Sequence, residues 1–476
     1  MTTFHVSLVG RGDLGGEIYR QMRQAILDGR LKAGDRLPAT RELARSLSVS
    51  RSTVTAAYER LLGEGLAESR AGAATFVSEK IALSGRKVLR SGAVNALQPR
   101  TVWNSVSALV AFDSSAKFDF RMGIPDATLF PHLMWRRAVT RALRSSETAE
   151  AFYGASTGFH ALRMAIADHI AISRSVKAMP EDLIITNGTQ QALDIVARIL
   201  IEPDDVIAME DPGYPPARHL FKSLRARVVG IPVDGEGLVV DQLPANARAV
   251  YVTPSHQFPL GIAMSLPRRR ALLAWAERHD AAIIEDDYDS EFRFGGHPLE
   301  PLQTLDASGR VIYIGTFSKT MLPALRLGFL VLPPSLHLAA TKAKFVSDWH
   351  SPSLAQPALA RFIADGSFAR HIRKVGKVYQ QRHAIVTATL ERDFADHLEL
   401  VPSKTGLHVA ALSRSTSVER IASVARRAAG LGVAIQQLSN FAVHTKQRSG
   451  ITIGYGAVAT SKIAEGLRRL RKCFLA

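Results

Sequence analysis

The sequence has a single cysteine, Cys473, and no apolar run long enough to cross a membrane. One cysteine cannot form a disulfide within the chain, and a membrane-spanning helix needs about 18 or more consecutive apolar residues. The longest apolar runs, such as residues 311–317, have the length of a β-strand. The first residues, MTTFHVSLVGRGDLGG, also lack the basic and then apolar pattern of a secretory signal. The sequence therefore predicts a cytoplasmic protein that does not span a membrane.

Acidic residues are in the minority, because 43 Asp and Glu stand against 60 Lys and Arg, for a formal net charge of +17. A strongly basic protein is a candidate for binding nucleic acid. The excess is spread along the chain, however, and residues 1–80 carry only +3 of it. The charge alone thus fits a polyanionic partner and an ordinary basic surface equally well.

The chain is longer than one usual domain, with 476 residues of which 46% are hydrophobic. Between about residues 81 and 117 the helix and strand patterns give way to Gly, Ser, Asn and scattered basic residues. Domain boundaries fall in such apolar-poor segments. We therefore predict an N-terminal domain over residues 10–80, a flexible linker over 81–117 and a C-terminal domain over 118–476.

Three segments of the N-terminal domain carry apolar residues at helical spacing. The first ends at Gly29, the second begins near Thr40, and the third begins at Ser50, which is a favoured N-cap residue. Residues 66–69 and 75–77 then predict a small β-hairpin. The expected core positions are Ile18, Met22, Ala25, Ile26, Leu43, Ala44, Leu47, Val54, Ala57, Tyr58, Leu61 and Leu62. This order predicts a helix-turn-helix followed by a β-wing.

The third segment has the properties of a recognition helix. Its first turn presents Arg51, Ser52 and Thr53, whose donors can reach phosphates and base edges in a major groove. The run ILDGRLKAGDRLPATRELARSLSVSRSTVTAAYERLLGEGL resembles the winged-helix domain of GntR-type repressors. That resemblance implies DNA contacts by Arg41, Arg51 and the wing residue Gly72. The sequence departs from the family pattern at Thr55, where an arginine is common, and in the wing, which reads AGAAT.

The C-terminal domain alternates strand-like apolar runs with helical patterns. Such alternation is typical of an α/β domain with a mostly parallel sheet, whose functional residues lie at the carboxyl ends of the strands. The predicted strands are residues 183–186, 206–209, 249–252, 281–285 and 311–315, and the predicted helices are residues 190–200, 216–224 and 269–278.

Unusual polar residues follow three of these strands. Each has an ordinary explanation by itself, such as a solvated lysine, a capping acidic pair or a Gly-Thr turn. Their combination and order resemble the fold type I aminotransferases. The residues are Gly188 and Thr189 after the first strand, Asp286, Asp287 and Tyr288 after the fourth, and Thr316, Ser318, Lys319 and Arg326 after the fifth.

This resemblance implies a site for pyridoxal 5'-phosphate. Lys319 matches the lysine whose amine forms a Schiff base with the aldehyde of the cofactor. Asp286 matches the carboxylate that keeps the pyridine nitrogen protonated, and the assignment of this role to Asp286 rather than Glu285 rests on alignment. Tyr288 matches the donor to the O3' oxygen of the ring, and Tyr214, in DPGYPP, matches the aromatic residue that stacks on it.

The phosphate group has its own implied partners. The backbone N–H groups of Gly188 and Thr189, at a helix N-terminus, would bind the dianion. Thr316 and Ser318 would add hydroxyl groups, and Arg326 a guanidinium group. We expect no metal ion in this site.

Two features leave alternatives open. His256 and Gln257, in TPSHQFPLG, both lie where aminotransferases place an asparagine beside O3', and the sequence does not decide between them. Tyr153, in AFYGASTGFHALR, matches the tyrosine that reaches across a dimer interface to the phosphate of the neighbouring cofactor. A homodimer is therefore expected, although an ordinary buried tyrosine before a turn is the alternative.

The whole chain is similar to the MocR subfamily of GntR-type regulators, which joins a winged helix to an aminotransferase-like domain. The motifs EDPGYP, TPSHQFP, IIEDDYDSEF and GTFSKTMLPALRLG carry this resemblance. It implies a homodimeric transcriptional regulator that binds double-stranded operator DNA and senses an amino compound, or pyridoxal phosphate itself, through the aldimine at Lys319. It does not identify the effector, the operator or the sign of regulation.

Two other functions compete with this one. An aminotransferase with an accessory DNA-binding domain is chemically possible, but a winged helix has no use in transamination. A relic without cofactor is disfavoured by the intact set of Lys319, Asp286 and Arg326.

The effector is the least constrained part of this interpretation. The two arginines that bind the carboxylate of ω-amino acids in some members match Pro216 and Asn440 here, which disfavours such an effector. Arg218 and Arg448 remain candidates for another acidic group or for the surface.

Overall fold

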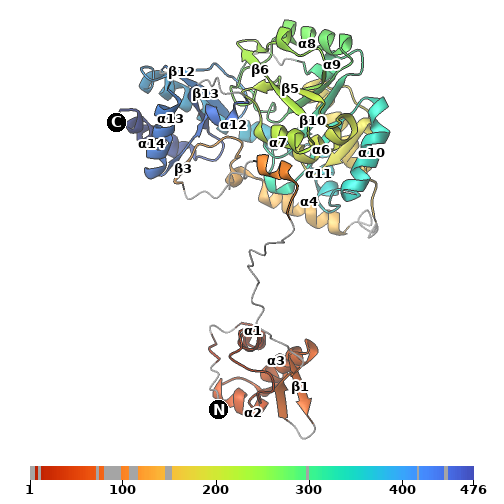
Figure 1. The fold of residues 1–476 in the computed structure, drawn as a ribbon. Helices are drawn as coiled ribbons and strands as arrows, with labels where there is room; N and C mark the ends of the chain where they lie inside the picture. Colours follow the sequence, from red (N-terminus) through yellow and green to blue (C-terminus); the bar gives the residue numbers. More distant parts are fainter. Residues whose placement is uncertain are drawn as a thin grey trace. The chain divides into compact units, whose positions relative to one another are not determined.

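The chain forms two compact units, Met1–Gln98 and Pro99–Ala476 (Figure 1). The computed structural model describes residues 6–8, 12–70, 74–79, 98–106, 116–144, 153–295, 300–414, 417–443 and 449–475. Gly72, Arg448 and most of the segment 81–117 lie outside these residues. Among the helices of the described part, none combines the length and the apolar character needed to cross a bilayer.

Part of the segment expected to be a linker is folded. Residues Thr101–Ser105 form a 3-10 helix, η1, which packs against α7 (Pro215–Ser223). The boundary between the two units falls after Gln98, inside the predicted linker and before this 3-10 helix. Residues 101–105 therefore belong to the C-terminal unit, and composition did not reveal this because a single 3-10 turn leaves no periodic apolar pattern.

The N-terminal unit contains the three predicted helices. The hydroxyl oxygen of Ser50 accepts the backbone N–H of Thr53 at 3.1 Å and so caps the third helix, as the sequence predicted. One face of each helix is buried in a common core that includes Ile18, Leu43 and Val54. The helices are α1 (Leu14–Leu27), α2 (Thr40–Ser46) and α3 (Arg51–Gly63).

The wing is a two-stranded antiparallel hairpin. It consists of β1 (Ala67–Arg70) and β2 (Ala74–Val77), with Glu68 opposite Phe76. Compared with the prediction, the first strand is displaced by one residue and the second begins one residue earlier. The hairpin closes against the helices, because Ala67 and Val77 are buried in their core.

An eight-stranded sheet forms the centre of the C-terminal unit, with the strand order β4-β11-β10-β9-β8-β5-β6-β7. The pairs from β10 through β6 are parallel, whereas β11 is antiparallel to both of its neighbours. The sheet is therefore mostly parallel, as predicted. The strands are β4 (Leu183–Thr186), β5 (Val206–Asp211), β6 (Arg227–Asp234), β7 (Gly237–Leu238), β8 (Ala247–Val252), β9 (Ala282–Asp287), β10 (Val311–Thr316) and β11 (Gly328–Val331).

Helices cover both faces of this sheet, because its strands are apolar on both sides. Ile284 and Ile312 point to the face covered by α6, α7 and α10. Ile283 and Val311, one position earlier in each strand, point to the face covered by α5, α8 and α11. Besides α7, the helices of these two layers are α5 (His160–Arg174), α6 (Thr189–Leu200), α8 (Leu266–Arg278), α10 (Pro334–Asp348) and α11 (Ala355–Ala364).

The last part of the chain forms a separate lobe, drawn in blue in Figure 1. Its four-stranded sheet has the order β12-β13-β16-β15, and β3 (Phe118–Asp119) pairs with β14 beside it, so residues far apart in the chain share one core. The remaining elements are α4 (His132–Arg144), α9 (Leu302–Leu305), α12 (Ser367–Asp393), β12 (Leu398–Leu400), β13 (His408–Ser413), α13 (Val418–Gly430), β14 (Val433–Ala434), β15 (Gln436–Gln437), β16 (Gly450–Gly454) and α14 (Thr460–Leu475).

Candidate functional site

Lys319 follows β10 and lies between the central sheet and the segment after β3. Its Nζ atom donates a hydrogen bond to the carbonyl oxygen of Gly123 at 2.7 Å. Gly123 has a φ of +78°, and a Cβ atom there would lie 3.2 Å from that Nζ. Burial lowers the pKa of the Lys319 amine, and the carboxylates of Asp289 and Asp286 offset part of this shift. A lysine with a lowered pKa offers more of the neutral, nucleophilic amine.

Asp286 is the last residue but one of strand β9 rather than a residue after it, and the alternation of the strand decides the direction of its side chain. It shares a face with Ile284, toward α6 and α7, where the hydroxyl of Tyr251 donates to its Oδ2 atom at 2.7 Å. Its Oδ1 atom is buried and has no hydrogen-bond partner among the described residues. Burial, aided by the carboxylate of Asp287, raises the pKa of Asp286 to about 7.

The neighbouring acids point to the opposite face, so strand alternation separates their roles. Asp287 accepts hydrogen bonds from Arg174 at 2.8 Å and from the hydroxyl of Tyr313 at 2.5 Å. Glu285 accepts the backbone N–H groups at the start of α9, from Leu302 and the following residue, at 3.0 Å each. Glu285 and the Oδ2 atom of Asp287 therefore have partners of their own, on the far side of the sheet from Tyr251, while the Oδ1 atom of Asp287 has no hydrogen-bond partner among the described residues.

Gly188 caps the N-terminus of α6, next to Arg326. The Nη2 atom of Arg326 donates to the carbonyl oxygen of Asn187 at 2.8 Å, and a Cβ atom on Gly188 would lie 2.9 Å from it. Gly188 also has a φ of +80°, a backbone conformation that favours glycine, and a side chain there would displace the guanidinium group of Arg326. Among the described residues, the backbone N–H groups of Gly188 and Thr189 have no acceptor. A helix N-terminus and a guanidinium group thus lie together, as an anion site requires.

We call the strand ends beside Gly188 and Arg326 the candidate anion-binding edge, and two hydroxyl groups lie along it. Thr316 is opposite Gly328 in the sheet, and Gly328 is opposite Thr186, so the ends of β10, β11 and β4 are level. The hydroxyl of Thr316 donates to that of Ser318 at 3.0 Å and accepts the backbone N–H of Ser318 at 3.2 Å. The structure therefore places Thr316 and Ser318 at the same edge of the sheet as Gly188.

Two tyrosines flank this region. The ring of Tyr214, just before α7, packs edge-on against Phe258 at 5.2 Å between centroids. Burial, and then the carboxylate of Asp286, raise the pKa of Tyr214. Tyr288 donates its hydroxyl to the carbonyl oxygen of His256 at 2.9 Å. Tyr288 thus depends on His256 for its position.

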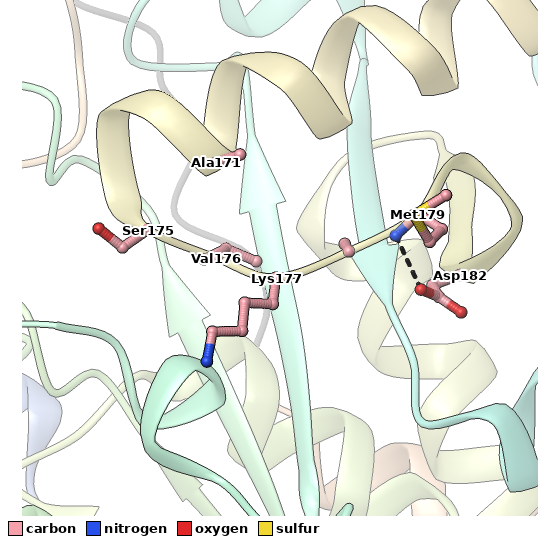
Figure 2. Close-up of a pocket in the computed structure, with 7 residues that line it drawn as sticks. Ala171, Ser175, Val176, Lys177, Met179 and Asp182 are labelled. Carbon is pink, nitrogen blue, oxygen red and sulfur yellow. Dashed lines mark hydrogen bonds between the residues drawn. The ribbon is translucent and has the colours of Figure 1, made fainter.

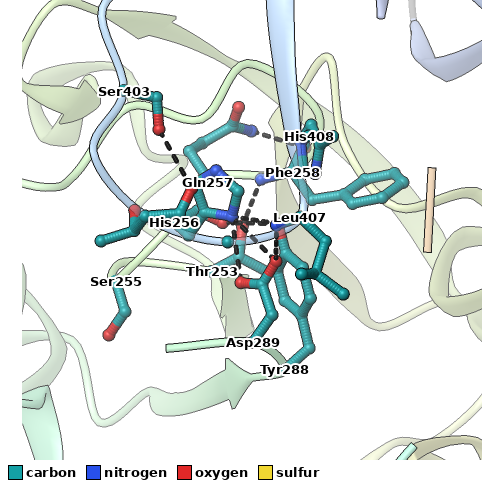
Figure 3. A network of polar contacts seen from close by, with 12 residues as sticks. Thr253, Ser255, His256, Gln257, Phe258, Tyr288, Asp289, Ser403, Leu407 and His408 are labelled. Carbon is teal, nitrogen blue, oxygen red and sulfur yellow. Dashed lines mark hydrogen bonds and ion pairs between the residues drawn. The ribbon is translucent and has the colours of Figure 1, made fainter. Parts of the chain in front are cut away.

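The geometry separates His256 from Gln257 (Figure 3). The side-chain amide of Gln257 donates to the carbonyls of Pro212 and Phe258 at 2.8 and 2.7 Å, and its oxygen accepts the N–H of Leu260 at 3.0 Å. Gln257 therefore holds the backbone turn. His256 is the residue whose side chain lies beside Tyr288.

His256 belongs to a buried polar network with Asp289 and His408 (Figure 3). Their possible metal-ligating atoms lie within 4.8 Å of one another. Asp289 accepts from Nδ1 of His256 at 3.0 Å and from the N–H of Leu407 at 3.2 Å, and Nε2 of His408 lies 3.1 Å from the carbonyl oxygen of Pro259. These hydrogen bonds join the central sheet to the C-terminal lobe, so the three side chains have a structural role.

Tyr153 lies at the surface, with 76% of its area exposed. Its ring contacts that of Trp349 at the end of α10, with centroids 4.2 Å apart. Other apolar side chains near this helix end are also exposed, among them Phe345 and Val346. Tyr153 is therefore positioned by a surface aromatic cluster and contacts no other predicted cofactor residue within the described chain.

The N-terminal unit presents the predicted DNA-binding residues differently. Arg41, Arg51 and Ser52 are exposed, and neither arginine forms an ion pair with a described residue. The hydroxyl of Thr53 lies 2.7 Å from that of Ser50, so it takes part in the helix cap. The structure thus leaves the two arginines available, whereas Thr53 is partly committed to the fold.

The wing arginine is already paired. Arg70 forms ion pairs with Glu68 at 2.8 Å and with Glu79 at 2.7 Å, and its guanidinium carbon lies 4.9 Å from the ring centroid of Phe76. The wing residue named in the sequence analysis, Gly72, lies outside the described residues.

A shallow surface pocket of about 600 Å³ lies at the end of α5 (Figure 2). Among the residues that line it, the backbone N–H of Met179 donates to the carboxylate of Asp182 at 2.8 Å, and this bond caps the following turn. None of the residues predicted to bind cofactor or DNA lines this pocket. The pocket therefore shares no residue with the sheet edge where Gly188, Lys319 and Arg326 lie.

Sequence reasoning missed three groups that shape the site: the carbonyl of Gly123, the hydroxyl of Tyr251 and the carboxylate of Asp289. Two weak signals were present. Tyr251 is a polar aromatic residue inside the apolar strand AVYV, and Gly123 stands alone in the run RMGIPD. Neither signal indicates a partner by itself.

Comparisons with known proteins match this architecture. Residues 14–77 match the family of bacterial regulatory proteins of the gntR type, and residues 123–470 match class I and II aminotransferases. The probable rhizopine catabolism regulatory protein MocR of Rhizobium meliloti is 39% identical over 97% of this chain and 93% of its own length. The pyridoxine biosynthesis transcriptional regulator PdxR of Corynebacterium glutamicum is 32% identical over 93% of this chain and 91% of its own.

A solved structure has the same fold in the C-terminal unit. LysN, the α-aminoadipate aminotransferase of Thermus thermophilus complexed with N-(5'-phosphopyridoxyl)-L-leucine, superposes with a TM-score of 0.68 and is 28% identical over 75% of this chain and 92% of LysN. The helix-turn-helix unit and the aminotransferase fold thus occur in one chain, and the similarity to MocR extends over both. The chain belongs to the MocR subfamily of GntR-type transcriptional regulators.

Proposed function

We propose that this regulator binds pyridoxal 5'-phosphate covalently through Lys319. The observation that carries the proposal is the buried Oδ1 atom of Asp286, which has no partner among the described residues. A protonated pyridine nitrogen would supply the missing hydrogen bond and the compensating charge, which a buried carboxylate requires. When bound, the cofactor supplies an aldehyde that condenses with amines and a ring that withdraws electrons.

The other residues of the site fit the rest of the cofactor. Gly188, Thr189, Thr316, Ser318 and Arg326 would bind the phosphate dianion by N–H, hydroxyl and guanidinium donors. Tyr214 would lie on the ring, and Tyr288 would donate to O3' after turning from the carbonyl of His256. The name of LysN, with its phosphopyridoxyl ligand, supports this use of the fold.

We propose that an amino compound, or the cofactor itself, regulates DNA binding by displacing the Lys319 amine from its present partner. Lys319 bonds to the carbonyl of Gly123, and the segment before Gly123 belongs to the C-terminal lobe, where Phe118 begins the pairing of β3 with β14. Release of the amine would therefore change the restraint on that lobe. The ligand shifts the equilibrium only by its difference in affinity for the two arrangements.

A homodimer is part of this proposal. Palindromic operators are read by paired helix-turn-helix units. Tyr153 is exposed and would reach the phosphate of a partner subunit. The name of PdxR, a pyridoxine biosynthesis regulator, supports pyridoxal phosphate as one effector.

The test combines the visible spectrum with operator binding. Footprinting of DNA next to the chain's own reading frame would locate the operator, and binding would be measured with and without pyridoxal phosphate and with candidate amines. We expect the amine that changes the spectrum to change the affinity for DNA. An amine that alters DNA binding without any spectral change would contradict the exchange at Lys319.

Aminotransferase activity is the second candidate function, since Lys319, Asp286 and Arg326 are all in place. Transamination over many turnovers at an ordinary enzymic rate, about 1–1,000 per second, would favour it. A single half-reaction with an amine would fit the regulator equally well.

Substitution of Asp286 by Asn should stabilise the cofactor-free protein at high pH. The pKa of Asp286 is raised to about 7 by burial, so the folded state binds a proton more tightly than the unfolded state. The ionisation of Asp286 therefore destabilises the folded wild-type protein. This loss of stability is absent below the unfolded pKa near 3.8, grows as the pH rises from there toward 7, and is complete above pH 7. We expect the free energy of unfolding of the variant to exceed that of the wild type by roughly 1–3 kcal/mol at about pH 8 and by less near pH 5.

The measurement is chemical unfolding of both proteins without cofactor at the two pH values. The same variant should bind pyridoxal phosphate more weakly, because a neutral amide does not hold the pyridine nitrogen in its protonated form. Equal stability of the two proteins at high pH would show that the Asp286 carboxylate is solvated instead.

A further inference from the structure

The end of α10 contains an ion pair between a buried lysine and a partly buried aspartate that the proposed chemistry does not use. The side chain of Lys344 is fully buried, and its ammonium group donates to both carboxylate oxygens of Asp348 at 2.6 and 2.7 Å. It also donates to the side-chain oxygens of Gln191 and Ser351 at 3.0 Å each. A buried ammonium group persists only with such partners, so the pair is fixed in place.

This ion pair is joined to the loop that begins α6. The carboxylate of Asp348 accepts the side-chain amide groups of Asn187 and Gln191, both at 2.7 Å. The side-chain oxygen of Gln191 in turn accepts the backbone N–H of Asn187 at 2.8 Å. The side chain and the backbone N–H of Asn187 are therefore both held, directly or through Gln191, by Lys344 and Asp348.

The third polar group of Asn187 points to the candidate anion-binding edge. Its carbonyl oxygen accepts the guanidinium group of Arg326 at 2.8 Å, and Gly188 follows it directly. Because the peptide unit is planar, the orientation of that carbonyl also fixes the N–H of Gly188. The ion pair thus orients Asn187, and Asn187 in turn fixes the direction of the N–H of Gly188 at the start of α6.

We propose that Lys344 and Asp348 are positioning residues that hold the loop 187–189 ready for the phosphate group of pyridoxal phosphate. The inference rests on the proposed cofactor site and adds residues that neither touch the cofactor nor belong to its motifs. An anion site whose donors are already oriented binds without the entropic cost of ordering a glycine loop. Loss of the ion pair should therefore weaken binding of the phosphate group in particular.

The experiment compares pyridoxal phosphate with pyridoxal, which has the aldehyde and ring but no phosphate group. In the Asp348→Asn variant we expect the affinity for pyridoxal phosphate to fall about tenfold or more, while that for pyridoxal stays within about twofold of wild type. Gln191→Met removes the acceptor of the backbone N–H of Asn187 and leaves the direct bond from the Asn187 side chain to Asp348, so it should show the same selectivity with a smaller loss. The control is Asp194→Asn, which removes an exposed ion pair with Arg198 on the same helix.

The outcomes separate this inference from the proposed function. Failure of the wild-type protein to bind either compound would overturn the cofactor proposal itself. Binding by the wild type with equal losses for both compounds in the variants would overturn the positioning role, because a general defect of the fold does not distinguish a phosphate group. Should Asp348→Asn not fold, judged by its circular dichroism, Gln191→Met alone decides the question.

Discussion

Replacing Lys319 with Ala is expected to abolish covalent attachment of pyridoxal phosphate. Wild-type protein saturated with the cofactor and reduced with borohydride should carry one phosphopyridoxyl group per chain, on the peptide that contains Lys319. The variant should carry none there, because Lys319 is the only lysine in residues 311–326 and its amine is the one that lies at Gly123. Peptide mass analysis measures the result, and the absorption of the bound cofactor in the visible range should change with it.

The matched control is Lys177→Ala, which removes an exposed lysine after α5. This variant should be labelled at Lys319 like the wild type. Labelling of many surface lysines at similar levels in all three proteins would indicate nonspecific reaction, and an unmodified Lys319 in saturated wild-type protein would remove the basis of the sensing proposal.

The loss at Lys319 should extend to regulation but not to the N-terminal unit. The winged helix has its own core, which includes Ile18, Val54 and Val77. We therefore expect Lys319→Ala to bind operator DNA and to respond to neither pyridoxal phosphate nor amines. A variant that keeps a full response would show that the effector acts elsewhere.

Local signals explain which parts of the fold the sequence predicted. The start of helix α3 could be placed to the residue because its cap and its apolar period are both encoded nearby, in Ser50 and in residues such as Val54 and Leu61. Strand β11, by contrast, is a four-residue run, GFLV, in which nothing indicates an antiparallel neighbour on each side. Its direction depends on pairing with strands that lie far away in the sequence.

The candidate site shows the same division. The sequence named Asp286 by resemblance but left Glu285 open. In strand β9 only Asp286 of the two faces Tyr251, and on this ground we propose Asp286 for the role. The contact of Lys319 with Gly123 spans 196 positions, and no local pattern reports it. Strand register and the packing of the C-terminal lobe decide such contacts, and both are properties of the folded chain.

Arg41→Ala and Arg51→Ala should each weaken binding to the operator. Both side chains are exposed at the start of α2 and α3 and form no ion pair with described residues, so their charge is available to phosphates or base edges. A lost contact of this kind costs about 1–3 kcal/mol, which is roughly a 5- to 150-fold loss in affinity. Fluorescence anisotropy with the footprinted DNA, at several salt concentrations, measures both the affinity and its salt dependence.

The salt dependence identifies the kind of contact. An arginine bound to a phosphate should lower the slope of log affinity against log salt by about one when it is removed, whereas an arginine that reads a base should change the affinity most for one sequence. Arg392→Ala, which breaks an exposed pair with Asp393 in α12, removes the same charge from the other unit and should leave binding unchanged. If Arg51→Ala bound the operator as tightly as this control, α3 would not be the helix that enters the groove.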